Sequence, residues 1–259
     1  MNIQQQRNKE KYEDLIFESN HYGFAKVINY VNKACVEVEF SNTGYKTITN
    51  LSQIKSGEVK DLLQASIAGV GVLGKDFKNK DAQTKIYQTW SKMIQRCYSD
   101  AKNIRNRTYE DCYVSKNFLN FSEFKKWCIN QIGVDSFDEK GKNFQLDKDI
   151  LVKGNKVYSE DTCCFVPQEI NTVLLTSKRI RGDNPIGVFY HNRDKKYVAK
   201  CKISNKTVHL GYYLTSTEAF IVYKKFKESY IKEVANKWKD QIDVRVYEAL
   251  MKYEVSIDD

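Results

Sequence analysis

The sequence lacks the features that would indicate a membrane or secreted protein. No run of roughly eighteen apolar residues, the length needed to span a bilayer, occurs in its 259 residues. Residues 1–7 are polar and contain no apolar core of the kind found in signal peptides. We therefore expect a cytoplasmic protein with no membrane partner.

Motifs for zinc and for dinucleotides are also missing. The seven cysteines include no Cys-x-x-Cys pair, and the adjacent Cys163 and Cys164 would point to opposite faces of a strand. We expect buried, reduced thiols and no zinc. Gly69 and Gly71 form a Gly-x-Gly without the third glycine of a dinucleotide loop, so they indicate a turn beside a strand.

The sequence does contain basic charge and aromatic side chains. Its 42 Lys and Arg residues exceed 33 Asp and Glu residues, which gives a net charge of +9, and 13% of residues are aromatic. A hydrophobic content of 41% can supply a core, which argues against global disorder. Lysines can contact phosphates and rings can stack on bases, so this composition favours a nucleic acid partner over a merely soluble basic protein.

The N-terminal part has the pattern of short strands. Apolar Val36, Val38 and Phe40 alternate with polar residues, and similar strands are expected over 21–30 and 46–51. Turn residues separate the three segments. We predict a short arm and a small SH3-like β-barrel in residues 1–64, followed by a linker over 65–83.

The central part has a strand–turn–strand–helix outline. An apolar run with two carboxylates covers residues 146–151, and Gly154-Asn155 marks a turn. A second apolar run covers 163–166, and Pro167 then opens a helix. Upstream, residues 84–98 and a segment from Phe121 have helical periodicity. We expect their tryptophans, Trp90 and Trp127, to pack in the core.

Residues 84–177 resemble the His-Me finger (HNH) core of phage and homing endonucleases. The resemblance is carried by Leu146-Asp147, by Tyr158-Ser159, by Asn171 on the helix, and by Trp90-x-x-Met93-x-x-Arg96-Cys97 and Phe121-x-x-Phe124-x-x-Trp127. It implies a ββα fold in which Asp147 and Asn171 hold a divalent metal. Oxygen ligands of this kind suit Mg²⁺ or Mn²⁺.

Two positions depart from the family pattern. Lys148 stands where the family has its general-base histidine, and Thr162 stands where it has the asparagine that orients this histidine. In an active enzyme Lys148 would have to act as the base or stabilise transition-state charge, with Thr162 at the orienting position. We expect a degenerate nuclease site.

A basic linker over residues 178–185 follows this domain. Lys178, Arg179 and Arg181 precede Gly and Asp, so the linker is expected to be flexible and to lie on phosphates. A solvated loop is the alternative interpretation.

The C-terminal part predicts three strands and a helix. Strands are expected over 186–190, 197–203 and 207–213, and Thr215 with Glu218 forms a capping box at the start of the helix. The sheet face away from this helix should carry Lys200 and Lys202, joined by His209, with Arg193 at the first turn. An ordinary solvated sheet face is the alternative.

This β3α unit resembles an AP2 DNA-binding domain. The matching residues are Gly187-Val188, Tyr197-Val198-Ala199, Leu210-Gly211-Tyr212 and Thr217-Glu218-Ala219. The resemblance implies that the sheet contacts the major groove of double-stranded DNA. Lysine is a point charge and lacks the bidentate fork of arginine, so weak base specificity is expected.

Together these patterns predict an α+β protein with a barrel, a ββα domain and, over 186–259, an AP2-like domain that ends in a further helix. Its predicted function is phage-type DNA binding, in the bacterial host cytoplasm if it is phage-encoded. One alternative is an active metal-dependent DNA endonuclease that nicks or cuts. Another is a nuclease scaffold reused to bind a host protein through the barrel.

Overall fold

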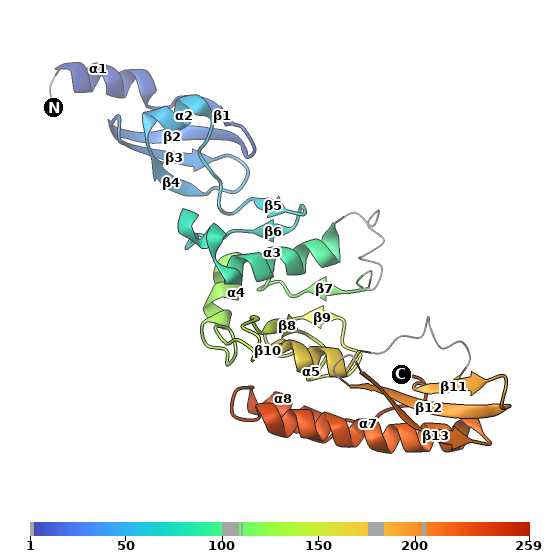
Figure 1. Cartoon of the computed structure of the whole chain (residues 1–259). Coiled ribbons are helices and arrows are strands. Elements are labelled where there is room, and N and C mark those ends of the chain that lie inside the picture. Colours follow the sequence, from blue (N-terminus) through green and yellow to red (C-terminus); the bar gives the residue numbers. More distant parts are fainter. Residues whose placement is uncertain (1–2, 100–108, 110, 176–183, 204–205) are drawn as a thin grey trace. The chain divides into compact units, whose positions relative to one another are not determined.

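The computed structural model describes residues 3–99, 109, 111–175, 184–203 and 206–259. It confirms a mixed α+β protein, in which helices accompany several small antiparallel sheets (Figure 1). The chain divides into two compact units, residues 1–126 and 127–259. Each unit is described by itself.

The first unit contains most of the short strands. Its elements are α1 (Ile3–Tyr12), β1 (Ile16–Ser19), β2 (Gly23–Asn32), β3 (Cys35–Phe40), β4 (Lys46–Thr49), α2 (Leu51–Ser56), β5 (Ala65–Ile67), β6 (Gly71–Val72), η1 (Asn79–Gln83), α3 (Lys85–Tyr98), β7 (Tyr113–Val114) and the first residues of α4 (Phe121–Cys128).

The N-terminal strands form an open sheet, so the predicted SH3-like barrel is wrong. Within the described residues the sheet has the order β1-β2-β3-β4, and β1 and β4 lie at its opposite edges. Asn50 accepts a hydrogen bond from the backbone N–H of Gln53 at 2.9 Å and starts α2 where a barrel would need another strand. Helices cover the apolar face instead: Ile54 of α2 joins the core, and Tyr12 of α1 stacks on Tyr30.

The segment predicted as a linker contains the β5–β6 hairpin and η1. Gly69 lies in the hairpin turn with a positive φ of 72°, as its sequence position predicted. Thr84 then caps α3 by accepting from the N–H of Tyr87. Trp90 is fully buried and its indole Nε1 donates to the Phe118 carbonyl at 2.7 Å, which confirms its core role.

The second unit contains the remaining elements. They are β8 (Gln145–Asp147), β9 (Val157–Tyr158), β10 (Cys164–Val166), α5 (Gln168–Val173), β11 (Val188–His191), β12 (Lys196–Ile203), β13 (Lys206–Tyr213), α7 (Ser216–Trp238) and α8 (Val244–Met251).

The predicted strand–turn–strand–helix outline is present in this unit. β8 and β10 pair antiparallel, with Asp147 opposite Cys164 and Gln145 opposite Val166. Gly154 has a φ of 78° in the turn between them, a conformation that glycine adopts without steric cost. Pro167 immediately precedes α5 in an extended conformation. Trp127 packs on Phe165 of β10, with 5.9 Å between their ring centroids.

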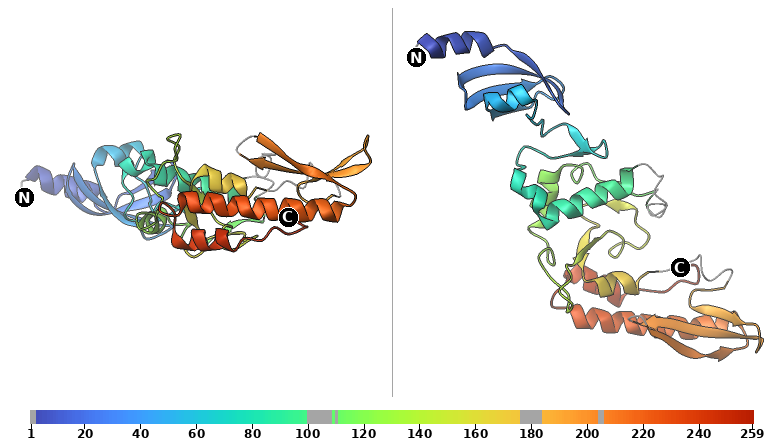
Figure 2. Two further views of the ribbon diagram at one scale, coloured as in Figure 1. Left: turned by 60° about the horizontal axis from the view of Figure 1, so that its bottom comes forward. Right: turned by 45° about the horizontal axis from the view of Figure 1, so that its top comes forward.

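The three C-terminal strands form an antiparallel sheet in the order β11-β12-β13. α7 lies along one face of this sheet, as Figures 1 and 2 show, and Phe220 and Tyr223 of α7 pack against Val188 and Ala199 of the sheet. The predicted capping box is present, because Thr215 and Glu218 each accept the other residue's backbone N–H. None of the described helices combines the length and apolar character that crossing a membrane requires.

Candidate functional sites

Asp147 lies at the end of β8, where the chain turns. Its Oδ1 accepts the backbone N–H groups of Asp149 at 2.8 Å and Ile150 at 3.0 Å, so the carboxylate holds the turn that follows the strand. Burial, and next the charge of Asp149, raise the pKa of Asp147 from 3.8 to about 6, against the opposing effect of these two hydrogen bonds. A substantial fraction of this carboxyl is therefore protonated at slightly acidic pH.

The Lys148 side chain is buried, with 9% of its surface exposed. Its Nζ contacts the Asp149 carboxylate at 3.1 Å and the Asn155 carbonyl at 3.0 Å, and it lies 5.7 Å from the centre of the Tyr158 ring. This amine is engaged by an acid, a carbonyl and an aromatic face. These contacts hold the amine within the loop, whereas a general base has to reach the water that it activates.

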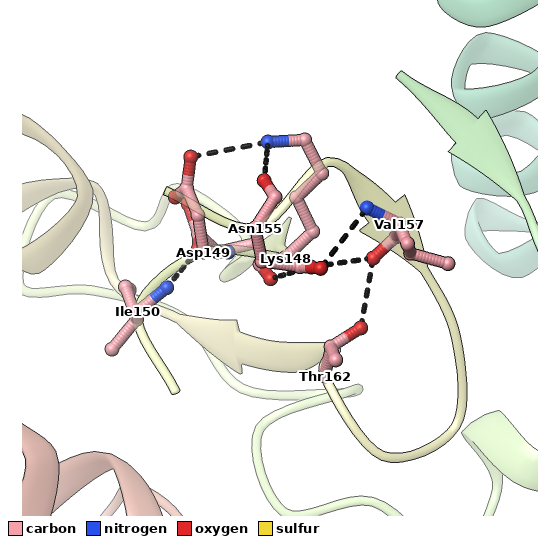
Figure 3. A network of polar contacts seen from close by, with 7 residues as sticks. Lys148, Asp149, Ile150, Asn155, Val157 and Thr162 are labelled. Carbon is pink, nitrogen blue, oxygen red and sulfur yellow. Dashed lines mark hydrogen bonds and ion pairs between the residues drawn. The ribbon is translucent and has the colours of Figure 1, made fainter. Parts of the chain in front are cut away.

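Thr162 belongs to the same loop network but its hydroxyl contacts the backbone (Figure 3). Thr162 Oγ1 donates to the Val157 carbonyl at 2.8 Å. Asn155 Nδ2 donates to that carbonyl at 2.7 Å and to the Lys148 carbonyl at 2.6 Å. Asn155 thus ties the chain at Lys148 to the chain at Val157, and Thr162 reaches this network at Val157.

Asn171 lies on α5, as predicted for the helical metal ligand. Its Nδ2 donates to Gln145 Oε1 at 2.9 Å, two residues before Asp147 on the same face of β8. Sequence reasoning did not identify Gln145, although its two-residue spacing from Asp147 on a strand was a usable signal.

A divalent metal would find an incomplete set of oxygen ligands here. Asp147 Oδ1 already accepts two N–H groups, and Asn171 donates to Gln145 through Nδ2, a bond that leaves its Oδ1 out. In the part of the chain that the structure describes, no three His, Cys, Asp or Glu side chains gather closely enough to hold a metal. Asp147 and Asn171 are therefore the two oxygen-bearing side chains that could hold a divalent metal between β8 and α5.

The cysteines beside this site are inert thiols. Cys163 and Cys164 are buried, and burial raises the pKa of Cys163 to about 12 and raises that of Cys164 as well. No disulfide joins the cysteines of the described residues, and five of the seven are buried.

The sheet face opposite α7 is the second candidate site. The strand register places Lys200 directly opposite His209, and Lys202 lies two residues further along β12 and therefore on the same face. Ala199 and Cys201, which alternate with them, pack in the core beneath. The predicted shared face of the two lysines and His209 is thus confirmed. Arg193 is exposed in the β11–β12 turn, also as predicted.

This face also carries aromatic rings that the sequence reasoning missed. Phe189 and Tyr212 are the cross-strand partners of Val198, one on each side. They are 38% and 49% exposed, whereas Val198 between them is 2% exposed. The signal was available, because both rings alternate with core residues along their strands.

Two histidine rings contact the Tyr212 ring. The His209 and Tyr212 ring centroids are 4.8 Å apart, and the His191 ring meets Tyr212 edge-on at 5.9 Å. His191 Nδ1 also lies 3.2 Å from Asp194 Oδ2. Across the sheet, Lys200 Nζ lies 5.9 Å from the centre of the Phe189 ring, within the range of a cation–π contact.

The excess of positive charge in the second unit is concentrated in this sheet. Residues 188–213 contain six Lys and Arg residues and one Asp, whereas the rest of 127–259 contains 16 Lys and Arg residues against 18 Asp and Glu. The predicted basic linker residues Lys178, Arg179 and Arg181 lie outside the described residues. We define the open face by Phe189, Lys196, Lys200, Lys202, His209 and Tyr212.

Comparisons with protein-family models, with curated proteins and with solved structures gave no match for this chain.

Proposed function

We propose that the protein binds double-stranded DNA through the open face of the β11–β12–β13 sheet. The observation that supports this proposal is the separation of faces: α7 covers one side of the sheet, and lysines, histidines and rings occupy the other. The local excess of basic residues gives this face the charge that phosphates attract. The AP2-like sequence pattern suggests contact with the major groove.

We further propose that the ββα segment is a degenerate His-Me finger with a structural rather than a catalytic role. Lys148 is bound to Asp149 and to a backbone carbonyl, and Thr162 is bound to Val157. Both side chains are engaged by neighbouring groups of the loop, and neither is placed to activate a water beside Asp147. An active metal-dependent endonuclease is the second candidate, favoured by the placement of Asp147 at the end of β8 and Asn171 on α5.

Replacement of two lysines on the open face tests the DNA-binding proposal. We expect Lys200→Ala with Lys202→Ala to weaken binding of a mixed-sequence duplex by about tenfold or more, because two phosphate contacts are lost. Fluorescence anisotropy at low salt measures the affinity. The matched control is Lys232→Ala with Lys239→Ala, which removes the same charge from an exposed position within α7 and from one just after its last residue.

An equal loss of DNA affinity in both double variants would show that the lysines of the open face act only through the overall charge of the protein. Unchanged affinity in a folded Lys200/Lys202 variant would move the contact to another surface. Failure of the wild-type protein to bind DNA at any salt concentration, together with a stable protein complex on pull-down, would favour the host-protein alternative.

A further inference from the structure

We infer that the rings of the open face bind unpaired bases, so that the protein prefers duplex DNA containing a short single-stranded gap over fully paired duplex. This inference rests on the proposed DNA-binding function. It assigns the bases to Phe189 and Tyr212, and the phosphates to the lysines around them.

The arrangement of the rings is the first argument. Phe189, Val198 and Tyr212 form one row across the three strands, with the buried valine in the middle. Adjacent strands are about 4.8 Å apart, so the backbone positions that carry the two rings lie roughly 10 Å from each other. Two bases from one strand can therefore each meet a separate ring.

The accessibility of the rings is the second argument. Phe189 has no polar group to hydrate, yet 38% of its surface is exposed on the edge strand β11. Tyr212 is 49% exposed while His191 and His209 contact it from two sides. Rings held by neighbours but left open to solvent are suited to stacking, because stacking then costs little side-chain entropy.

The type of cation is the third argument. The described residues of β11, β12 and β13 carry lysines and no arginine, and Arg193 lies in the turn between β11 and β12. Without arginine the strands lack the bidentate fork that recognises guanine in a paired duplex. Lysines that contact phosphates, beside rings that stack on any base, form the usual combination for strands with unpaired bases.

A charged rim surrounds the rings. Lys200 lies next to Phe189, and Lys196 and Lys202 occupy the same face of β12. One acid, Asp194, lies in the adjacent turn, where it meets His191. The rim can neutralise the phosphates that flank two stacked nucleotides.

Three labelled DNA probes of identical length and flanking sequence test the inference. The first is a fully paired duplex, the second has a central gap that leaves three bases unpaired, and the third has the same gap with abasic sugars in place of those bases. We expect the gapped probe to bind at least about 30-fold more tightly than the other two, since each of two stacked bases contributes about 1–3 kcal/mol.

Variants of the two rings test whether these rings cause the preference for the gapped probe. Phe189→Leu and Tyr212→Leu keep Val198 covered but remove the flat ring, so each should lower the ratio of gapped-probe affinity to paired-duplex affinity by about fivefold or more. Tyr190→Leu is the matched control: this ring is 46% exposed but pairs with Tyr197 on the α7 side. A thermal unfolding scan confirms that each variant is folded.

A fluorescent base analogue in the gap reports stacking directly. Its emission should be quenched by the wild-type protein and by Tyr190→Leu, and less by Tyr212→Leu. Equal affinity for gapped, abasic and paired probes would overturn the inference while leaving the DNA-binding proposal standing. Absence of binding to all three probes would overturn both.

Discussion

Asp147 has two possible roles: it holds the turn after β8, or it is a metal ligand of a nuclease site. Its titration can distinguish them. Because its pKa is raised, the folded protein binds a proton between about pH 4 and pH 6 that the unfolded chain does not bind. Stability therefore falls as the pH rises through that window. Above pH 6 the ionised carboxylate costs on the order of 1–3 kcal/mol.

We predict that Asp147→Asn stabilises the protein at neutral pH. Asparagine can still accept the N–H groups of Asp149 and Ile150 without a buried charge. The gain should be about 1–3 kcal/mol at pH 7.5 in the presence of a chelator, and it should disappear near pH 4. Urea unfolding at both pH values measures it, with the exposed Asp161→Asn as control. A loss of stability at pH 7.5 would contradict this role for Asp147.

Lys148 is the residue at which the nuclease alternative can be tested. Loss of a positioned general base typically costs about 10²–10⁴ in rate, so we predict little or no plasmid nicking by the wild-type protein with Mg²⁺ or Mn²⁺. Lys148→His, alone or with Thr162→Asn, should raise metal-dependent nicking, and adding Asp147→Ala should abolish the gain. Rapid cutting by the wild type that Lys148→His abolishes would show instead that the lysine is catalytic.

The contact between α5 and α7 joins the ββα segment to the three-stranded sheet. Glu169 of α5 accepts hydrogen bonds from Lys237 Nζ at 2.7 Å and from Trp238 Nε1 at 2.8 Å, and Trp238 is buried. Burial alone would raise the pKa of Glu169, but these two bonds outweigh it and lower the pKa. Their stabilisation is complete at neutral pH and is lost as the pH falls through the lowered pKa.

We predict that Glu169→Ala destabilises the second unit by about 1–3 kcal/mol at pH 7, because the buried indole N–H loses its acceptor. Glu169→Gln should cost less, since its amide oxygen can still accept that bond. The control is Glu139→Ala, which removes an exposed ion pair with Lys237 at 3.2 Å and should cost under about 1 kcal/mol. Equal costs for Glu169→Ala and Glu139→Ala in denaturant unfolding would show that this contact does not stabilise the unit.

For the whole chain, the net charge of +9 predicts strong salt dependence of DNA binding. The logarithm of the affinity should fall linearly with the logarithm of the salt concentration, by about 0.9 per phosphate neutralised. Lys200→Ala with Lys202→Ala should therefore reduce the slope by about 2, whereas Lys232→Ala with Lys239→Ala should leave it unchanged. Titrations between 50 and 300 mM salt, roughly the range where screening changes most, provide the measurement. A flat dependence would contradict electrostatic binding.

Local sequence signals determined most of the second unit. Alternating apolar residues predicted β12 and β13, and the Thr215–Glu218 capping box placed the start of α7. These signals involve residues a few positions apart, so they act before any tertiary contact forms. Periodicity failed for β1 and α2 in the first unit, which have four and six residues and are too short to show a repeat.

Only the tertiary structure decided whether the N-terminal strands form a barrel or an open sheet, and what the site residues contact. The sequence predicts strands without their distant partners, so it could not distinguish a barrel from the open β1–β4 sheet. It also placed Asn171 on a helix without revealing Gln145 as its partner, 26 positions away. The row of Phe189, Val198 and Tyr212 depends on the register of three strands, and register is set by packing against α7.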